Sequence, residues 1–356
     1  MKFCLYNVTT AIKQGGIETF YWEIAKELKK RGIEIELISG QGNFIKYSDI
    51  PLKQFDFTSR DKIIDLGNRF RKWGERISFF KNAYPYLKKQ NYDYFLIHKP
   101  LDFFTAFFMK NINPNLKVIF ISGGEDFYGF DKFFSKYIDY MFAVSRDNAN
   151  IIRTRYKRDV EILHNGVNVE LFKKDETIRK ELRKKYNLEN KKVLISVGRI
   201  VGWKGYQLVI KAIKELDVKY VLIGDGEYLN ELKKLAKQEK VDNKVLFLGS
   251  VSNNELYKYL NMADVFIQPS IGHEAFGITI IEAMACGLPV VASKNGGILD
   301  IISDGKNGYL FEVNNIDEMK EKIKYAFASK IDSRKYVIKN FTWEKSVDKL
   351  LSNIKD

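Results

Sequence analysis

The chain has 356 residues, which is too long for one ordinary hydrophobic core and comfortable for two domains. Hydrophobic residues make up 45% of it and charged residues 29%, which excludes a disordered chain, and no apolar run approaches the roughly 20 residues of a membrane span. Cys4 and Cys286 lie far apart and in no metal-binding spacing, so we expect a reduced, cytoplasmic protein without a signal peptide. The net charge of +14 favours an anionic partner: a nucleic acid, an anionic membrane surface or a phosphorylated substrate.

Strand and helix patterns alternate through the first half of the chain. This alternation predicts a largely parallel, doubly wound sheet with helices on its faces. A helix is expected to begin near residue 16 and to end at Gly32, because glycine often follows the last helical turn. The predicted strands of this half cover residues 2–6, 33–38, 94–97, 118–121, 140–144 and 160–163.

An amphipathic helix is predicted over residues 63–87, because apolar side chains recur there at every third or fourth position. We favour packing of this apolar stripe on the first sheet over insertion into a membrane. The basic residues on the other faces are compatible with peripheral contact between residues 60–89 and an anionic membrane. The apolar positions are Ile63, Leu66, Phe70, Trp73, Ile77, Phe80, Tyr84 and Leu87.

The polar, strongly charged stretch 170–191 interrupts the alternation and marks a predicted domain boundary. A second series of strands and helices follows, so we expect an α/β chain of two Rossmann-like domains, over 1–170 and 171–340. A terminal helix over 341–356 is expected to pack back on the first domain. Ligands of such sheets bind beyond the carboxyl ends of the strands, and we expect the two rims to face a central cleft. The predicted strands of the second half cover residues 193–197, 220–223, 245–248, 265–267, 290–292 and 308–311.

Glycines follow the first strand of each half. Gly15 and Gly16 precede a helix, where backbone N–H groups and the helix dipole favour an anion, although a tight turn explains the pair equally well. In the second half, Gly198 leads to Arg199 and Lys204 on a short loop. A guanidinium donates in bidentate fashion and an ammonium acts as a point charge, so this pair suits a diphosphate better than a solvated surface role.

The next strand of the second half ends in Gly224-Asp225-Gly226. These glycines indicate either close approach of the backbone to a ligand or a helix entry capped by Asp225, and we favour the structural interpretation slightly.

The segment 268–289 carries two carboxylates in different local structures. Glu274 lies on a loop after a strand, and Glu282 lies on a helix predicted from near Gly277 to Gly287. Carboxylates accept hydrogen bonds from sugar hydroxyls, and the free N–H groups around 276–278 are able to hold phosphate. The apolar neighbours of Glu282 argue against a simple surface charge, so both carboxylates are expected to face one pocket.

With these residues in place, the chain resembles the retaining GT-B-fold glycosyltransferases of family 4, the glycosyl transferases group 1. The resemblance covers most of the chain, and its motifs are specific jointly rather than singly. They are Gly15-Gly16, His98, Asn165-Gly166-Val167, Gly198-Arg199, Lys204-Gly205, Gly224-Asp225-Gly226, Pro269-Ser270, the Glu274-x7-Glu282 pair, Gly287-Leu288-Pro289-Val290 and Gly296-Gly297.

The resemblance implies roles for residues of the second half. Arg199 and Lys204 would bind the donor diphosphate and stabilise the leaving group. Glu282 would hold the ribose hydroxyls, and Glu274 would contact hydroxyls of the transferred sugar. The backbone of Val251 would touch the base.

The resemblance also implies backbone contacts with the donor. The N–H groups of Phe276 and Gly277 would meet the sugar or phosphate, and the N–H of Gly16 would reach the diphosphate from the first domain. His98, from that domain too, would sit beside the anomeric centre, so closure of the two halves is expected to accompany catalysis. The glycines at 15, 198 and 224 complete the predicted donor site.

Some residues depart from the family's pattern. Asp300 stands where similar proteins often carry glutamate, and the segment 122–126 (Ser-Gly-Gly-Glu-Asp) replaces a more usual His-Asp, which leaves the acceptor open. The chain has no Asp-x-Asp and only 3 histidines, so no metal site is predicted. Arginine, lysine and helix dipoles would then stabilise the leaving diphosphate.

The resemblance implies a retaining hexosyltransferase that moves a sugar from a nucleotide-diphosphate sugar to a glycan or lipid-linked glycan. The expected setting is assembly of cell-envelope polysaccharide, lipopolysaccharide or glycoprotein glycans, in the cytoplasm or at the inner face of the membrane. A sugar-nucleotide epimerase of the same fold stays open as an alternative, as does a basic nucleic-acid- or membrane-binding protein without catalysis. A nicotinamide oxidoreductase would need the absent G-x-G-x-x-G, and no nucleic-acid-binding module is recognised, so we expect no nucleic-acid partner.

Overall fold

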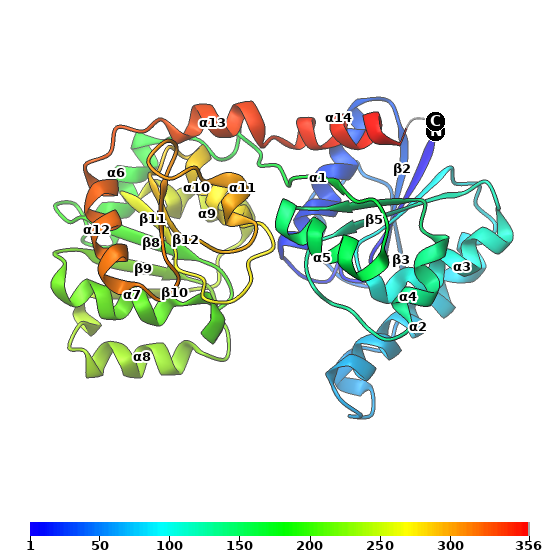
Figure 1. Cartoon of the computed structure of the whole chain (residues 1–356), viewed down its shortest axis with the longest axis horizontal. Coiled ribbons are helices and arrows are strands. Elements are labelled where there is room, and N and C mark those ends of the chain that lie inside the picture. The colour runs from blue at the N-terminus through cyan, green and yellow to red at the C-terminus, as the bar shows by residue number, and fades with distance from the viewer. Residues whose placement is uncertain (355–356) are drawn as a thin grey trace. The chain divides into compact units, whose positions relative to one another are not determined.

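The computed structural model describes residues 1–354 and divides the chain into two units, each built around one parallel sheet (Figure 1). The first unit takes in residues 1–165 and the chain from Trp343 onward, and the second runs from Gly166 to Thr342. The boundary between the two units follows Asn165. It lies a few residues before the charged stretch 170–191, at which the sequence predicts the domain boundary.

The first sheet has seven strands in the order β3-β2-β1-β4-β5-β6-β7, all paired in parallel. Its strands are β1 (Lys2–Tyr6), β2 (Glu34–Gly40), β3 (Leu52–Phe55), β4 (Tyr94–Ile97), β5 (Lys117–Ser122), β6 (Tyr140–Ala143) and β7 (Glu161–Ile162). Its helices are α1 (Gly16–Lys30), α2 (Asn68–Leu87), α3 (Phe103–Ile112), α4 (Asp131–Phe134), α5 (Arg146–Tyr156) and α14 (Trp343–Asn353).

Strand β3 is the one strand of this sheet that the sequence analysis missed. It pairs with β2 alone at the edge of the sheet, and it is half-buried, with the polar residues Lys53 and Gln54 at its centre. An edge strand needs no continuous apolar run, so its sequence lacks the signal that marks the buried strands.

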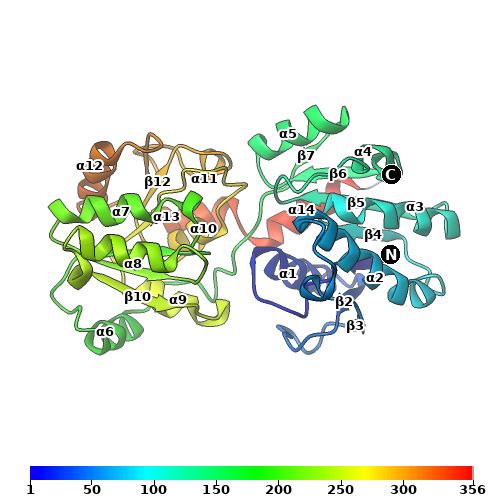
Figure 2. The same cartoon turned by 90° about the horizontal axis from the view of Figure 1, so that it is seen from below.

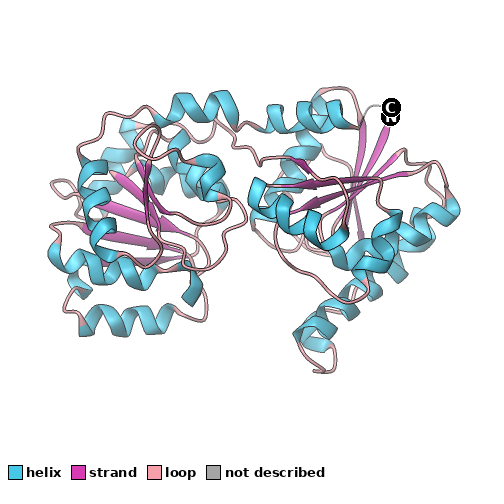
Figure 3. Cartoon of the chain, viewed as in Figure 1, coloured by secondary structure: helices cyan, strands magenta, loops and turns pink. Residues whose placement is uncertain are grey.

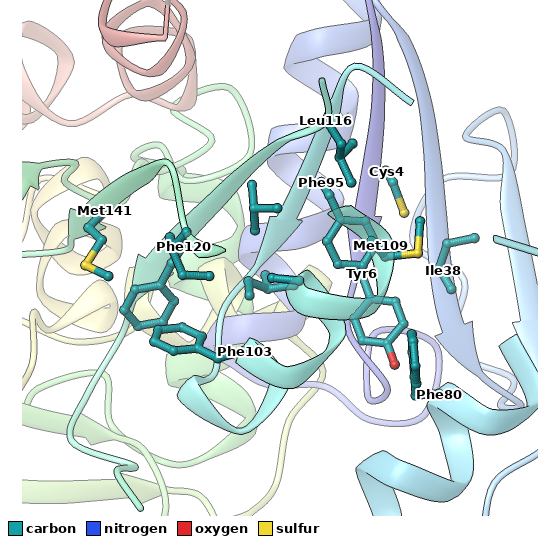
Figure 4. Close-up of a cluster of buried hydrophobic side chains, with 14 of the residues drawn as sticks. Cys4, Tyr6, Ile38, Phe80, Phe95, Phe103, Met109, Leu116, Phe120 and Met141 are labelled. Atoms are coloured by element: carbon teal, nitrogen blue, oxygen red, sulfur yellow. The ribbon is translucent and has the colours of Figure 1, made fainter. Parts of the chain in front are cut away.

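Both faces of the first sheet are buried, as expected when crossover helices cover a parallel sheet. Along β1, Phe3 and Leu5 join one core cluster with α1 and α14, whereas Cys4 and Tyr6 join another with α2 and α3 (Figure 4). The terminal helix α14 lies beside α1 (Figures 1 and 2). Its apolar side is fully part of the first cluster, so a segment from the end of the chain completes the core of the N-terminal unit.

Helix α2 divides into a buried and an exposed half. It begins at Asn68, later than the predicted 63, after Gly67 with a φ of 98°. Its second half is packed on the sheet through Phe79 and Leu87, which are completely buried, but Trp73 in its first half is 41% exposed. The prediction that the whole apolar stripe packs on the sheet is therefore wrong for the first half of α2. Figure 1 shows the first turns of α2 standing away from the sheet.

The second sheet has six parallel strands in the order β10-β9-β8-β11-β12-β13, and all six lie where the sequence predicts them (Figure 3). They are β8 (Val193–Val197), β9 (Lys219–Ile223), β10 (Val245–Gly249), β11 (Val265–Gln268), β12 (Val290–Ser293) and β13 (Tyr309–Phe311). The helices of this unit are α6 (Glu176–Lys185), α7 (Tyr206–Ala212), α8 (Leu229–Gln238), α9 (Asn253–Asn261), α10 (Ile278–Ala285), α11 (Ile298–Ile301), α12 (Ile316–Phe327) and α13 (Ser333–Asn340).

The strand order reverses direction at an equivalent place in the two sheets. The reversal lies between β1 and β4 in the first sheet and between β8 and β11 in the second. Crevices at such switch points, beyond the carboxyl ends of the strands, are where doubly wound sheets bind ligands. Most of the predicted site residues follow these four strands, where a ligand site is expected. Gly224 and Val251 instead follow the neighbouring strands β9 and β10, and Glu282 lies on α10.

Candidate active site

Loops at the carboxyl edge of the second sheet are packed backbone against backbone, and glycine makes this contact possible. A Cβ added to Gly205, which follows the β8 loop, would lie 1.9 Å from the carbonyl oxygen of Pro269 after β11. One added to Gly224, after β9, would lie 1.9 Å from the carbonyl oxygen of Gly198. Any side chain here would separate the loops, so these glycines have a packing role whatever they bind.

Gly296 and Gly297 make the same kind of contact with the loop that carries Glu274. The N–H of Gly297 donates to the carbonyl oxygen of Glu274 at 2.7 Å, and a Cβ on Gly297 would lie 2.2 Å from the carbonyl oxygen of Ala275. The loop after β12 therefore fixes the backbone of the loop after β11, and with it the direction of the Glu274 side chain.

Glu274 and Lys204 form an ion pair across the switch point. The Lys204 Nζ lies 2.6 Å from Glu274 Oε2, and both side chains are largely buried. The same carboxylate oxygen accepts hydrogen bonds from Gln268 Nε2 at 3.2 Å and from Ser270 Oγ at 3.1 Å. The sequence analysis assigned Lys204 to the diphosphate and Glu274 to the sugar, whereas in the structure the two side chains bind each other. Because an ammonium has three donors, Lys204 keeps the capacity to bind a phosphate as well.

Arg199 differs from Lys204 although both lie on the β8 loop. Its side chain is exposed and makes no hydrogen bond or ion pair with any residue of the described part of the chain. A guanidinium stays charged at any ordinary pH. The loop therefore presents one cation that is held by a carboxylate and one that is available to a bound anion.

Glu282 is buried on α10, with 3% of its surface exposed. Its Oε1 accepts a hydrogen bond at 3.1 Å from Asn253 Nδ2, at the start of α9. Val251, the residue predicted to touch the base, lies two positions before Asn253 and is half-buried. The two carboxylates thus bond to different elements: Glu274 to the β8 loop and Glu282 to the segment after β10.

The N-terminus of α10 has no side-chain cap. Gly277 precedes the helix with a φ of 103°, a left-handed conformation that favours glycine. Phe276 is buried, and its ring packs against Phe341 with the centroids 5.8 Å apart. An uncapped helix N-terminus retains free N–H groups and a partial positive charge, so this end of α10 suits an anion.

In the first unit, the helix N-terminus after β1 is covered by a carboxylate of the helix itself. Gly15 is extended and α1 begins at Gly16. Glu18, in the first turn, is buried, accepts a hydrogen bond from Thr9 Oγ1, and would lie 2.5 Å from a Cβ on Gly15. This carboxylate already supplies negative charge near the predicted contact of Gly16 with a diphosphate.

His98 follows β4 at the switch point of the first sheet and is 4% exposed. Its ring packs against Phe20, and a Cβ on Gly123 would lie 2.4 Å from His98 Nε2. Burial, with the neighbouring cations Lys99 and Arg76, lowers the pKa of His98 to about 3. The imidazole is therefore neutral near pH 7, and a neutral imidazole has one nitrogen that donates a hydrogen bond and one that accepts.

The unusual segment 122–126 ends in a carboxylate that is bound by two lysines. Asp126 lies 2.5 Å from Lys99 Nζ and 3.2 Å from Lys72 Nζ. Its pKa is held below the ordinary range by these lysines, which outweigh the opposing effect of burial. This carboxylate consequently stays ionised and links α2 to the β4 loop.

Three polar partners in these sites escaped the sequence analysis: Gln268, Asn253 and Glu18. Gln268 ends a strand and Asn253 begins a helix, which are ordinary places for amides, so nothing in the local pattern marked them. Glu18, three residues after Gly15, does carry a signal, because an acidic residue in the first turn of a helix favours its dipole.

Among residues 1–354, no group of three or more His, Cys, Asp or Glu side chains is arranged to hold a metal ion. No helix in that range is both long and apolar enough to cross a bilayer.

Two family descriptions match successive parts of the chain. "Glycosyltransferase Family 4" matches residues 14–171, and "Glycosyl transferases group 1" matches residues 178–343. The first covers the N-terminal sheet apart from β1, and the second covers the loops that carry Arg199 and Glu274 and the helix that carries Glu282. The chain belongs to the family 4 glycosyltransferases, a family of retaining enzymes, and its two Rossmann-like units form the GT-B fold.

Individual relatives agree with this family. An uncharacterized glycosyltransferase of Methanocaldococcus jannaschii, MJ1069, is 32% identical over 239 residues, which cover 62% of this chain and 60% of the relative. The GDP-mannose-dependent alpha-(1-6)-phosphatidylinositol monomannoside mannosyltransferase of Mycolicibacterium smegmatis is 30% identical over 202 residues, 52% of this chain and 53% of the relative. The chain thus spans between about half and three fifths of the lengths of these relatives.

The fold is also that of solved structures. Alr3699/HepE of Anabaena, solved in complex with UDP and glucose, superposes with a TM-score of 0.82 at 19% identity, with 99% of both chains covered. At this identity the likeness concerns the fold.

Proposed function

We propose that this protein is a retaining glycosyltransferase that uses a nucleotide-diphosphate sugar as donor and that its donor site lies at the switch point of the second sheet. The observation that carries the proposal is the charge arrangement there: an exposed, unpartnered Arg199 on the same loop as a Lys204 that is bonded to Glu274. A diphosphate fits the cations, and sugar hydroxyls fit the carboxylates.

The roles proposed for the side chains are compatible with the contacts that they make in the structure. Arg199 binds the diphosphate and is free to do so without breaking another bond. Lys204 bridges the diphosphate to Glu274, which accepts from hydroxyls of the transferred sugar. Glu282 accepts from the ribose hydroxyls, next to Val251, whose backbone meets the base. The backbone N–H groups at Phe276 and Gly277, beside the N-terminus of α10, are proposed as donors to the phosphate or sugar.

In the reaction, the bond between the anomeric carbon and the phosphate oxygen breaks, and the acceptor oxygen bonds to that carbon on the same face. The acceptor's proton passes to the departing phosphate oxygen, so the products are a glycoside and a nucleoside diphosphate. Negative charge grows on the leaving group, and preorganised donors aimed at it lower the barrier. Arg199 and Lys204 supply these donors in the proposed mechanism.

The first unit contributes Gly16 and His98 to the proposal. The neutral imidazole of His98 is a hydrogen-bonding partner for the sugar near the anomeric centre, since its lowered pKa keeps it uncharged. The Gly16 N–H is assigned to the diphosphate. The diphosphate would compete with the Glu18 carboxylate for the partial positive charge at the N-terminus of α1.

The proposed acceptor is a glycan or a lipid-linked glycan. The proposed location of the reaction is the cytoplasm, at an anionic membrane. Support comes from the basic residues around α2, and from the mannosyltransferase relative, whose name gives phosphatidylinositol monomannoside.

A thermal-shift panel of UDP, GDP, ADP and their sugars tests the donor site. A ligand at about 100 times its dissociation constant adds roughly 2.7 kcal/mol to the stability of the folded state. We expect one base to raise the melting temperature of the wild type and of the control Lys237→Ala, an exposed lysine on α8, but not of Arg199→Ala. Equal shifts in wild type and Arg199→Ala would remove Arg199 from the site.

Product analysis then separates transfer from epimerisation. A transferase forms a glycoside only when an acceptor is added, whereas an epimerase changes the nucleotide sugar without one. Proton NMR of the fresh glycoside tests retention, because an inverted anomeric configuration contradicts attack on the same face.

A further inference from the structure

A cavity of about 800 Å³ lies within the first unit, between α2, the start of α3 and residues 128–134. It is lined mainly by apolar and aromatic side chains, among them Trp73, Ile77, Phe80, Leu101, Phe104 and Phe134. The volume falls in the range of about 300–1,000 Å³ that small-molecule sites occupy. None of the residues assigned to the donor lines it, so the cavity is separate from the proposed donor site.

The rim of the cavity exposes large aromatic side chains to solvent. Phe130 is 73% exposed, Trp73 is 41% exposed and Phe108 is 40% exposed. Contiguous exposed apolar surface on a folded unit marks a binding site more often than single exposed residues do. The helix that carries Trp73 is the same α2 whose second half is packed normally on the sheet, so the exposure is confined to the cavity end.

The charges around the cavity are positive wherever they are not already matched. Asp131 is buried but lies 2.5 Å from Arg155, which also donates to its second oxygen at 3.0 Å. Arg69 and Lys81, which also line the cavity, make no ion pair or side-chain hydrogen bond with any described residue. An anionic group at the rim would therefore meet two available cations.

We propose that this cavity binds the hydrocarbon chain of an anionic lipid whose phosphate lies at Arg69 and Lys81. A sugar or nucleotide does not fit, because its many polar groups would be buried against carbon with no hydrogen-bonding partner. A single apolar chain needs no such partner and gains free energy by leaving water. The lipid's role as glycosyl acceptor rests on the proposed function, whereas the site itself rests on the geometry of this unit.

The test uses a monomeric lipid, so that a bilayer surface is not required. Dodecyl phosphate with bromine on its last two carbons is added below its critical micelle concentration, and quenching of tryptophan fluorescence is recorded. The background is Trp203→Phe, which removes the other half-exposed tryptophan; Trp22 and Trp343 are 0% and 4% exposed. We expect saturable quenching from Trp73, and an absence of quenching would overturn the proposal.

Two variants separate the cavity from a general apolar surface. Phe108→Glu places a carboxylate in the cavity, at a position exposed enough for folding to survive, and should weaken binding at least about 10-fold. Its control, Phe133→Glu, changes an aromatic residue that is 61% exposed on α4 and does not line the cavity, and it should bind as the parent does. Equal weakening in both variants would contradict the cavity as the site.

Lys81→Ala tests the position of the phosphate. It should weaken binding of dodecyl phosphate roughly 2- to 5-fold, as loss of one solvent-accessible ion pair predicts, and leave brominated dodecanol unchanged. The same loss for the alcohol would overturn the assignment of the phosphate. A dimer of this chain that forms at higher concentration and excludes the probe would show that a second copy, rather than a lipid, covers the cavity.

The lipid-binding test and the nucleotide-binding test can fail independently of each other. If the lipid probe binds and no nucleotide does, the cavity stands and the transferase proposal fails. If a nucleotide binds and the probe does not, the transferase proposal stands and the lipid site fails.

Discussion

The two units share a strand order but differ in what their switch points offer a ligand. Beyond β8 and β11, the loops present an exposed arginine, a lysine bonded to Glu274 and an uncapped helix N-terminus. Beyond β1 and β4, the helix N-terminus is covered by Glu18, His98 is neutral and buried, and Lys99 is already paired with Asp126. Both sheets therefore have a switch point at which a ligand is able to bind. The charged side chains on the loops differ between the two switch points, and we expect them to determine which ligand each one accepts.

Arg199→Ala should have the largest effect, since it removes the available cation from the second switch point. We expect kcat/KM with the identified donor to fall by about 10²–10³-fold, in line with the loss of one group that stabilises a leaving charge. Stability should change little, because the side chain is exposed and unpartnered. Steady-state kinetics and thermal melting measure the two effects, and a large loss of stability would indicate a structural role.

Gly205→Ala tests whether loop packing holds the second rim together. Gly205 has a φ of 75°, and its Cβ would clash with the carbonyl oxygen of Pro269. We expect destabilisation of roughly 2–4 kcal/mol, from strain plus displacement of the β11 loop.

The matched control for this glycine is Gly287→Ala, with a φ of 81° and nothing within 4 Å of the added carbon. It should lose only about 1–2 kcal/mol, the cost of the left-handed conformation alone. Urea unfolding compares the two variants, and equal losses would mean that the contact with Pro269 relaxes freely.

His98 should make the stability of the first unit depend on pH. Its pKa is about 3 in the folded protein and 6.5 in the unfolded chain, so the unfolded state binds more protons between these values. Stability therefore falls as the pH drops below 6.5, by about 2 kcal/mol between pH 7 and pH 5.

His98→Gln, which cannot be protonated in this range, should remove that dependence, whereas His164→Gln in the same unit should retain it. Thermal melting at pH 5 and pH 7 gives the comparison. An unchanged pH dependence in His98→Gln would assign the effect to another group.

Glu18→Gln should have the smallest effect. Loss of a charge near the first turn of α1 is expected to reduce stability by about 0.3–1 kcal/mol. If Gly16 contacts the diphosphate, removal of the competing carboxylate should also tighten nucleoside diphosphate binding by roughly 2- to 5-fold. Titration calorimetry measures the affinity, and weaker binding would show that Glu18 supports the site rather than competing for it.

Much of the fold was predictable because buried parallel strands are continuous apolar runs. All six strands of the second sheet carry that signal, whereas the edge strand β3, with Lys53 and Gln54 at its centre, does not. The glycines after the strands were recognised as positions for a ligand contact, a tight turn or a helix entry. Their partners were not, since Gly224 meets Gly198 and Gly205 meets Pro269 only after distant loops come together.

The sequence by itself determined that the chain has two doubly wound halves, that charged and glycine residues gather at their strand ends, and that the set resembles family 4 glycosyltransferases. These conclusions rest on local periodicity and on the residue types that a diphosphate and a sugar require. Only the tertiary structure decided that Lys204 is bonded to Glu274 while Arg199 is not, because pairing depends on loops that are 70 residues apart. The same holds for α2, where periodicity gave one continuous stripe and packing divided it into a core half and the wall of a cavity.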